Sequence, residues 1–560
     1  MGTAAVVAVS SFASAAPLQL PGAVQPGRDR PLPEAPAAPE YDFRLESPQR
    51  SPVPRAVDEI HFRLNDVRIV GAVTLPPEQF RPLFAALIGK DVTLSDILNI
   101  ADIIEAKYRA AGYLLVRAYV PPQRVKDGVF TIDVVEGYVA SVSVEGSNEG
   151  AQSATKAILE PVLDEKPLKM ETMERALLLT NDLPGISATG VLKPSATTTG
   201  ASDLVVSELQ PLWNAGFSVN NRGSRFSGLW TTTASGAING IFGADQLAAA
   251  FTISPDQSSQ MAGQLRYRRP IGGDGLIGSI FGVITHGQPG SSLTALGVNT
   301  DSWAVGPRLT YPLIRSRAQT LSLDGGFTFQ DARVNAAGVP NSHDQWRVLD
   351  LSVNYLNSNF LDGAWSGTLD LAQGLPIFGA SPNGCTPAHP TNCSNNLSRV
   401  GGHTDFTKFT GAAHVTWPLI DALGTTLAMQ GQYTFVPLIN GEQIAFGGLQ
   451  IGSGYDPGAI TGDNGIGGKA EIHYDTRIPS WSILALQPYV YLDGAEAWYI
   501  HGKAQGLNNY SIASVGGGLR FWFPYNIAGD VEVARTLNAV PGSDGGHQAT
   551  KVLMDAAVNF

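Results

Sequence analysis

A two-residue alternation of apolar and polar side chains runs from about residue 211 to the end of this 560-residue chain. A β-strand points successive side chains to opposite faces, so the alternation predicts strands with one apolar and one polar face. Two examples are LSLDGGFTFQ, with Leu321, Leu323, Phe327 and Phe329 on one face, and TLAMQGQYTF, with Leu427, Met429, Tyr433 and Phe435. A soluble β-sandwich could contain such strands, but so long a series without helices exceeds one sandwich.

The composition favours a membrane environment for these strands. Hydrophobic residues make up 43% of the chain and charged residues only 15%, compared with about 25% charged residues in soluble domains. A run of about 18 apolar residues is missing, which excludes a helical membrane protein. Membrane strands need roughly 10 residues each, so residues 211–560 accommodate about sixteen of them. Because lipid cannot satisfy an open sheet edge, we predict a closed transmembrane antiparallel β-barrel.

Charge and motif content narrow the function. The net charge of −12 argues against a nucleic-acid partner, because phosphate binding needs clustered basic residues. The glycine-rich stretch GDNGIGGKA (462–470) has neither the glycine spacing of a phosphate-binding loop nor a following Ser or Thr. HExxH zinc motifs and G-x-S-x-G nucleophile elbows are also missing from the sequence. We therefore expect no enzymatic activity, no cofactor and no bound metal.

Two segments precede the folded part of the chain. Residues 1–16 are mostly apolar and end at Ala13-Ser14-Ala15, which is typical of a signal peptide and its cleavage site. The Lys or Arg that usually precedes the apolar stretch of a signal peptide is missing. Residues 1–16 are therefore interpreted either as a truncated signal peptide or as a disordered Ala-rich leader. Residues 17–57 are rich in proline and poor in aromatic residues, which predicts an extended periplasmic linker.

The region between linker and barrel contains an internal repeat. Residues 58–136 and 137–210 share the predicted element order β-α-α-β-β, at a spacing of about 75 residues. In the first unit, the helix within LSDILNIADIIEAKYRAAG is expected to begin at Ser95 as N-cap and to end at Gly112. The repeat predicts two αβ modules in front of the barrel, and neither has the clustered titratable residues of an active site.

The chain contains two cysteines, Cys385 and Cys393, in the stretch GCTPAHPTNC. Seven intervening residues in an otherwise cysteine-free chain favour a small disulfide-closed loop in an oxidising compartment, with two unrelated thiols as the alternative. A metal site is disfavoured because His389 would be the only other soft ligand nearby.

Several motifs resemble those of two-partner secretion transporters of the haemolysin secretion/activation type, within the POTRA-barrel superfamily. The segment GYLLVRAYVPPQRVKDGVFTIDVVEGYV (112–139) is similar to the family's first POTRA (polypeptide-transport-associated) module, and NDLPG (181–185) is similar to its second. YPLIRSRAQTLSLDGGF (311–327) resembles the family's barrel, and Phe560 matches its carboxyl-terminal assembly signal. The resemblance covers residues 58–560. It implies two POTRA modules at 58–136 and 137–210 and a barrel at 211–560.

The resemblance also implies a long loop that folds back into the pore. The matching stretch is FGGLQIGSGYDPGAITGDNG (446–465), with Ser453, Gly454 and Tyr455 at the expected tip. The family usually has arginine where Ser453 stands, paired with an aspartate of the barrel wall, which YLDGA supplies as Asp493. A serine offers Asp493 no charge, so either the loop is held more weakly or another cation, Lys469 or Arg477, approaches the carboxylate. A plain surface loop is the alternative reading of this stretch.

The function implied by the resemblance is export through the bacterial outer membrane. An outer-membrane pore with periplasmic POTRA modules would secrete a large unfolded exoprotein, such as an adhesin or haemolysin. Its other expected partners are outer-membrane lipid and, during insertion, the barrel assembly machinery. In the family a helix before the first module can plug the pore, but residues 17–57 contain too many prolines for a stable plug helix. The alternatives are an assembly factor that inserts other barrels and, less favoured, a diffusion porin.

Overall fold

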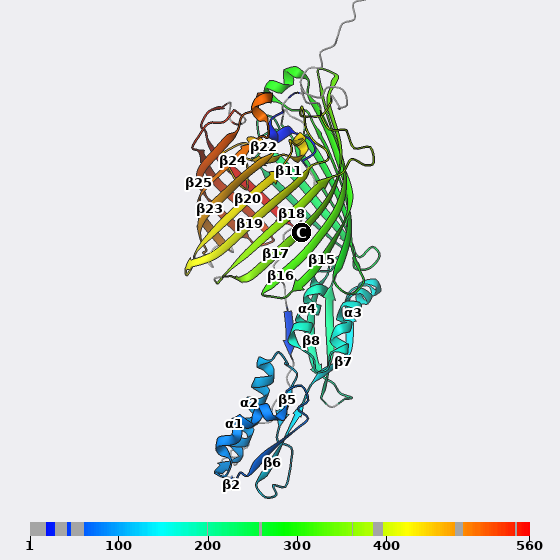
Figure 1. The fold of residues 1–560 in the computed structure, drawn as a ribbon, viewed down its shortest axis with the longest axis vertical. Coiled ribbons are helices and arrows are strands. Elements are labelled where there is room, and N and C mark those ends of the chain that lie inside the picture. Colours follow the sequence, from blue (N-terminus) through cyan, green and yellow to red (C-terminus); the bar gives the residue numbers. More distant parts are fainter. Residues whose placement is uncertain are drawn as a thin grey trace, which may run out of the picture.

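The computed structural model describes residues 18, 20–28, 42–45, 61–198, 200–256, 260–360, 362–384, 396–476, 485–541, 543 and 546–560. These residues form two small αβ modules in line with a large β-barrel, and the second module lies between the first module and the barrel (Figure 1). The expected signal segment 1–16 and the cysteines Cys385 and Cys393 lie outside the described residues.

The first module is a three-stranded sheet covered by one long helix. Its elements are β2 (His61–Arg63), β3 (Asp66–Val70), η3 (Pro77–Phe80), α1 (Arg81–Phe84), η4 (Ala85–Leu87), β4 (Asp91–Thr93), α2 (Leu94–Ala110), β5 (Arg117–Tyr119) and β6 (Val129–Val135). The main sheet has the order β3-β6-β5, and β2 pairs with β4 separately. Helix α2 buries Ile97, Ile100 and Ile104, which lie on one helical face, in the module's core.

The N-cap of α2 is Thr93, so the expectation of Ser95 is wrong by two residues. The amide of Asp96 donates to Thr93 Oγ1 at 3.3 Å, and the amide of Thr93 donates to Asp96 Oδ2 at 2.8 Å. This reciprocal pair is a capping box, which satisfies two amides that a helix start leaves without partners.

The second module repeats the β-α-α-β-β order. It consists of β7 (Tyr138–Glu145), α3 (Glu149–Asp164), α4 (Met170–Asn181), β8 (Ser187–Pro194) and β9 (Ala201–Leu209). A strand from the linker, β1 (Asp42–Leu45), pairs in parallel with β8, so the sheet order becomes β1-β8-β9-β7. The β8 edge of the second module is therefore already occupied by the chain itself.

Sixteen antiparallel strands form the closed barrel, as the alternation of the sequence predicted. The strands are β10 (Trp213–Asn220), β11 (Thr231–Asn239), β12 (Gln246–Ser254), β13 (Gln260–Ile271), β14 (Leu276–Gly287), β15 (Asn299–Arg315), β16 (Gln319–Ala336), β17 (Val339–Phe360), β18 (Gly363–Gly374), β19 (Thr407–Ile420), β20 (Leu423–Thr434), β23 (Asn464–Tyr474), β24 (Ala485–Trp498), β25 (Tyr510–Phe523), β26 (Ile527–Thr536) and β27 (Thr550–Asn559). The barrel closes where β10 pairs with β27, in a register that runs from Gly216 opposite Asn559 to Asn220 opposite Asp555.

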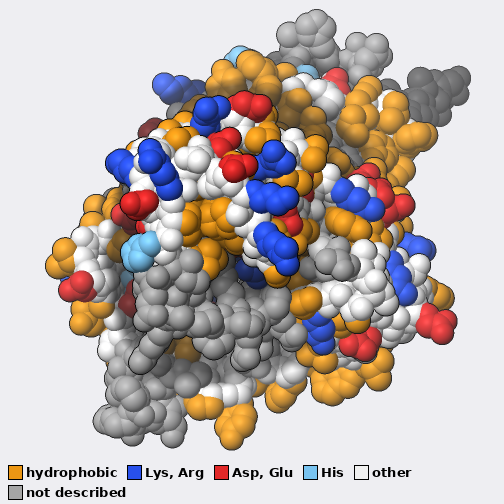
Figure 2. Space-filling model, turned by 90° about the horizontal axis from the view of Figure 1, so that it is seen from below, with side chains coloured by type: hydrophobic (Ala, Val, Ile, Leu, Met, Phe, Trp, Pro, Cys, Tyr) orange, Lys and Arg blue, Asp and Glu red, His pale blue; other side chains and the backbone are white. Residues whose placement is uncertain are grey.

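The two faces of the strands differ as the sequence predicted. In β20, the outward residues Met429 and Tyr433 are 55% and 52% exposed, whereas Gln432 and Thr434 are buried inside. Viewed along the barrel from the module end, apolar side chains gather at the periphery of the molecule (Figure 2). An apolar outer face and a polar lumen are the arrangement that a lipid bilayer requires of a barrel. Within the described ranges, no helix is both long and apolar enough to cross a membrane.

Candidate functional site: a loop folded into the barrel lumen

The connection between β20 and β23 folds back into the barrel. Two short strands within it, β21 (Ile444–Phe446) and β22 (Ile460–Gly462), pair as a hairpin. The apolar side chains of the connection pack with inward residues of β24 and β25 and with one residue after β26 in one cluster: Ile444, Phe446, Ile451, Tyr455, Ala459, Ile460, Ala495, Ala497, Ile512 and Val540. The segment is therefore packed in the lumen rather than extended as a surface loop.

The tip of this loop contacts the inner wall through its backbone. The amide of Ser453 donates to Asp493 Oδ2 at 2.9 Å, and the amide of Gly454 donates to Ser514 Oγ at 3.2 Å. The hydroxyl of Ser514 donates in turn to the other oxygen of Asp493. The hydroxyl of Tyr455 lies 2.8 Å from the carbonyl oxygens of Ala513 and Asn538. The expected tip residues and Asp493 are thus brought together, with an amide in place of an arginine.

Lys469 supplies the positive charge that the tip itself lacks. This residue is the direct cross-strand neighbour of Asp493 in the β23–β24 pair. Its ammonium donates to Ser453 Oγ at 3.3 Å and lies 3.9 Å from the centre of the Tyr491 ring. Of the two cations named as substitutes for the usual arginine, Lys469 lies opposite Asp493, and Arg477 lies outside the described residues.

A polar network continues from this tip to the seam where the barrel closes. The hydroxyl of Tyr491 donates to Glu532 on β26. Glu532 and Asp530 each accept from Arg222 Nη2, at 3.0 and 2.9 Å, and Arg222 Nε lies 2.5 Å from Asp555 on β27. Arg222 follows β10, so this one guanidinium bridges the first and the last strands of the barrel. Loop tip and seam are therefore joined through side chains.

Two buried ion pairs hold the base of the loop, and neither was predicted. Arg399 and Asp463 form a pair in which both side chains are fully buried. Asp463 also accepts the amides of Leu438 and Ile500, at 2.9 and 2.8 Å. A buried charge must be paired and hydrogen-bonded to be tolerated, and Asp463 meets that condition.

The second ion pair at the base of the loop joins β19 to the segment before β21. Lys408 lies 2.6 Å from Glu442 Oε2, and Trp346 Nε1 donates to Glu442 Oε1 at 2.7 Å. Sequence reasoning missed both pairs because their members are tens of residues apart in segments without a motif.

Residues 20–28 occupy the same end of the barrel as the loop, which corrects the prediction of an extended linker for this stretch. Here Gly22–Val24 form a short 3-10 helix at the end of the barrel away from the modules (Figure 1). Leu20 and Val24 are buried with Phe226, Leu293, Val298 and Val334. The backbone of Gly22 approaches Gly458 of the loop so closely that a Cβ would lie 2.3 Å from its carbonyl oxygen. Prolines disfavour a long helix but permit such turns, so this segment packs in the lumen without a plug helix.

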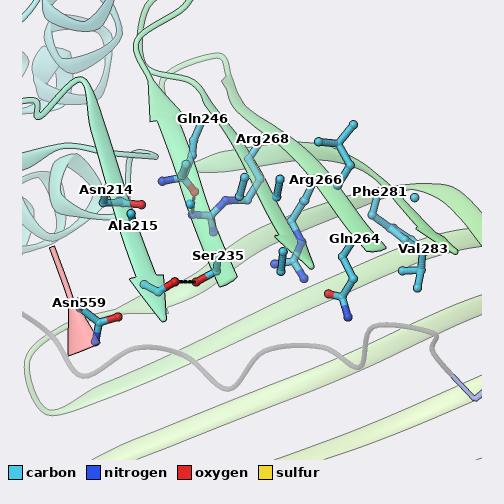
Figure 3. Close-up of a pocket in the computed structure, with 18 of the residues that line it drawn as sticks. Asn214, Ala215, Ser235, Gln246, Gln264, Arg266, Arg268, Phe281, Val283 and Asn559 are labelled. Carbon is cyan, nitrogen blue, oxygen red and sulfur yellow. Dashed lines mark hydrogen bonds between the residues drawn. The ribbon is translucent and has the colours of Figure 1, made fainter. Parts of the chain in front are cut away.

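The opposite wall of the lumen is polar and lines a cavity. Gln246, Gln264, Arg266 and Arg268 of β12 and β13 project into it together with Asn214 and Ser235 (Figure 3). Arg268 Nη2 donates to Gln246 Oε1 at 2.9 Å. Phe560 borders the same cavity, where its amide donates to the carbonyl of Ala215 at 2.8 Å. The wall formed by β12 and β13 thus offers amide and guanidinium side chains that can form hydrogen bonds.

Family models and related sequences match most of this chain. The family model described as haemolysin secretion/activation protein ShlB/FhaC/HecB matches residues 200–521, and the model described as POTRA domain, ShlB-type, matches residues 62–137. The heme/hemopexin transporter protein HuxB of Haemophilus influenzae is 22% identical over 489 residues, covering 86% of this chain and 84% of its own. The hemolysin transporter protein HpmB of Proteus mirabilis is 24% identical over 447 residues, covering 77% and 76%.

Solved structures share the fold. CdiB from Escherichia coli superposes with a TM-score of 0.67 at 18% identity, covering 91% of this chain and 93% of that one. BamA from Haemophilus ducreyi lacking POTRA domains 1–3 has a TM-score of 0.54 at 13% identity, covering 89% and 100%. Because the first family model spans more than half of the chain, this protein belongs to the haemolysin secretion/activation family of two-partner secretion transporters, outer-membrane β-barrels with periplasmic POTRA modules.

Proposed function

We propose that this protein exports one large, unfolded partner exoprotein from the periplasm to the cell surface, and that it does so as a pore rather than as an enzyme. The observation that carries the proposal is a lumen filled by parts of the chain that are not barrel strands, namely residues 20–28 and loop 446–465. These segments keep the pore closed at rest, and their displacement opens a route along the polar wall of β12 and β13. Relatives named for hemolysin and heme/hemopexin transport support an exoprotein as cargo.

The polar wall suits a chain in transit. An unfolded client presents one amide and one carbonyl per residue, and these need partners wherever water is restricted. Gln246 and Gln264 each carry both a donor and an acceptor, so they serve any sequence that passes. The periplasm lacks ATP, so folding of the client outside the cell supplies the bias for export.

The first POTRA module is the proposed receptor for the client. A sheet edge captures an extended peptide by main-chain hydrogen bonds, which gives affinity for many sequences. In the second module, β1 already covers the β8 edge. We assign capture to the β5 edge of the first module, where Tyr119 is 47% exposed.

Site-specific photo-crosslinking tests this assignment. A photoreactive residue at Tyr119 should crosslink to the co-expressed client during export. The matched control is Val73, which is 83% exposed and follows β3 at the opposite edge of the same sheet. Equal crosslinking from both positions, or none from Tyr119 while export proceeds, would contradict capture at β5.

Phe560 is proposed as the signal that the barrel assembly machinery reads during insertion. It is 70% exposed at the seam, next to β10. Phe560→Ser should lower the amount of folded barrel in the outer membrane. Tyr525→Ser is the control, because Tyr525 is an aromatic residue of 87% exposure in the turn before β26; equal losses in both variants would contradict a specific signal.

A further inference from the structure

The outer face of the barrel carries a row of charged and polar side chains near the end away from the modules. The row crosses the four neighbouring strands β14–β17, and β16 contributes two of its residues. The sheet register places His286 opposite Asp301, Asp301 opposite Arg333, and Arg333 opposite His343. Asp331 lies two residues before Arg333 on the same face of β16. We call these five residues the outer polar row.

A groove with an apolar floor adjoins this row. Phe251, Met261, Ile284 and Trp303 line it, together with His286, Asp301, Asp331 and Arg333 of the row. Gly263 opens the groove, because it has no side chain and lies between Phe251 and Ile284 in the register. The apolar lining is exposed, with Ile284 at 67% and Phe251 at 51%. The groove therefore has an apolar body and a polar end.

The height of the row matches the outer border of the membrane. Strand β16 begins at Gln319, beside the second POTRA module, and reaches Asp331 after twelve further residues. At about 3.3 Å per residue and a tilt of about 40°, this distance corresponds to a rise of about 30 Å. The apolar band of such barrels is about 25 Å tall. The groove thus faces the acyl chains of the outer leaflet, and the row faces its headgroups.

Arg333 is the group of the row that is held in place and still open to a ligand. Its Nε and Nη2 donate to Asp331 Oδ1 and Oδ2 at 3.1 and 3.4 Å, and its side chain remains 56% exposed. Arg347 on the neighbouring strand faces the same way but is 6% exposed, and it donates to three backbone carbonyls, those of Phe378, Gln330 and Trp346. Arg347 is thus engaged by the protein, whereas Arg333 is presented outward.

The two carboxylates of the row differ in exposure, since Asp331 is 4% exposed and Asp301 is 51% exposed. Asp331 accepts from His343 at 2.9 Å and from Gln345 at 3.0 Å, in addition to Arg333. Asp301 lies 2.7 Å from His286 Nδ1. Asp331 is thus compensated within the protein, and the outward edge of the Arg333 guanidinium is the donor that the row presents to an anion from outside. Guanidinium geometry matches phosphate by paired hydrogen bonds.

We propose that the outer polar row and its groove bind a phosphorylated glycolipid of the outer leaflet, with a phosphate at Arg333 and an acyl chain along Ile284 and Trp303. Neither half of the site suffices for this ligand. A free phosphate would use Arg333 but leave the groove empty, and an uncharged lipid would use the groove but not the row.

The test is a binding titration on the full-length protein in detergent micelles, with dissociation constants from native mass spectrometry. The three probes are diphosphorylated lipid A, the same lipid with both phosphates removed, and inorganic phosphate. Wild-type protein should bind the phosphorylated lipid at least tenfold more tightly than either other probe. Arg333→Ala should remove most of that preference, since a charge-assisted hydrogen bond is worth roughly a factor of ten.

Matched variants separate this site from general effects on the barrel. Arg269→Ala removes an exposed arginine near the other end of β13 and should leave binding unchanged. Gly263→Leu fills the groove. Gly411→Leu is the control, because it adds the same side chain at an outward glycine of β19. The space is similar at the two positions: a Cβ at 263 would lie 3.3 Å from Ile284 Cγ1, and a Cβ at 411 would lie 3.4 Å from Leu369 Cδ2. Only Gly263→Leu should weaken lipid binding. Heat-modifiable migration on gels checks that the barrels of both variants are folded. Equal binding of dephosphorylated lipid or of inorganic phosphate, or equal effects of Arg333→Ala and Arg269→Ala, would overturn the proposal.

Discussion

The carboxylate of Asp182 holds the guanidinium of Arg315 through two hydrogen bonds of 2.7 Å each. Asp182 follows helix α4 of the second POTRA module, within NDLPG, and Arg315 ends strand β15, within YPLIRSR. Two motifs that are 133 residues apart in the chain therefore meet at the junction between module and barrel. Arg175 adds a bond to the carbonyl of Pro312 at 2.9 Å. The second module is thus fixed to the barrel by paired hydrogen bonds rather than tethered by a linker.

Asp182→Ala should loosen this junction. The side chain of Arg315 is only 4% exposed, so its guanidinium would lose its charged partner in a largely dry site, at a cost of about 2 kcal/mol. We expect faster hydrogen exchange in α4 and in residues 312–317 at the end of β15, and reduced secretion of the client. The control is Arg317→Ala, which removes an exposed pair with Glu174 that should contribute less than about 1 kcal/mol. Identical exchange in both variants would contradict a junction built on Asp182.

The loop tip should respond to the position of its cation. Lys469→Ser removes the ammonium beside Ser453 and Asp493, so the loop should leave the lumen more often and single-channel recordings should show more frequent openings. Adding Ser453→Arg to the same chain moves the charge onto the loop and should restore the closed state. Unchanged current fluctuations in both proteins would mean that the tip is not held by charge.

The buried pair at the loop base should matter for stability rather than for gating alone. Asp463→Asn keeps the size of the side chain but leaves Arg399 as an uncompensated buried cation. The expected loss is roughly 3–5 kcal/mol, seen as a lower temperature for the heat-modifiable shift of the barrel on gels. Asp405→Asn serves as control, since its pair with His403 is partly exposed and should contribute little. A loss of equal size in the control would contradict the prediction.

Glu136 should make the first POTRA module sensitive to acid. Burial alone would raise its pKa, but hydrogen bonds from Tyr108, from Thr74 and from the amide of Val73 outweigh burial and hold the pKa of Glu136 below its ordinary value. A lowered folded-state pKa means that the carboxylate stabilises the module above the ordinary pKa of about 4.5, and that this stability is lost as the pH falls through the lower folded value.

Hydrogen exchange of the Val73 and Thr74 amides, measured between neutral pH and about pH 3, checks this prediction. After correction for the intrinsic exchange rate, protection should fall at the acid end in wild-type protein. Glu136→Gln should show lower protection that no longer changes with pH. The same acid loss in both proteins would assign the effect to another group.

The fold was largely predictable from the sequence, because its strongest signals are periodic. Alternation such as that of Leu427, Met429 and Tyr433 reports a lipid-facing strand wherever it occurs, and the second module follows its predicted order element by element. Caps are local and less certain: Thr93 and Ser95 are both plausible N-caps, and only the geometry with Asp96 selects the first.

The site was predictable only where a motif marked it. Ser453, Gly454, Tyr455 and Asp493 were found through the family pattern, whereas Arg399–Asp463 and Lys408–Glu442 were not, because long-range pairing of single charges leaves no local signal. Burial of residues 20–28 was missed for a related reason. Proline-rich composition predicts an unfolded segment when it is alone in water, but the connections between barrel strands supply apolar partners such as Phe226 and Leu293.

Secretion of a co-expressed client tests the central claim most directly. Cells that produce this protein together with its partner exoprotein are compared with cells whose transporter lacks residues 58–136, and the client is measured in the medium. We predict loss of the client from the medium while the truncated barrel still assembles in the outer membrane. Normal secretion by the truncated transporter would contradict a pore that receives its client through the first POTRA module.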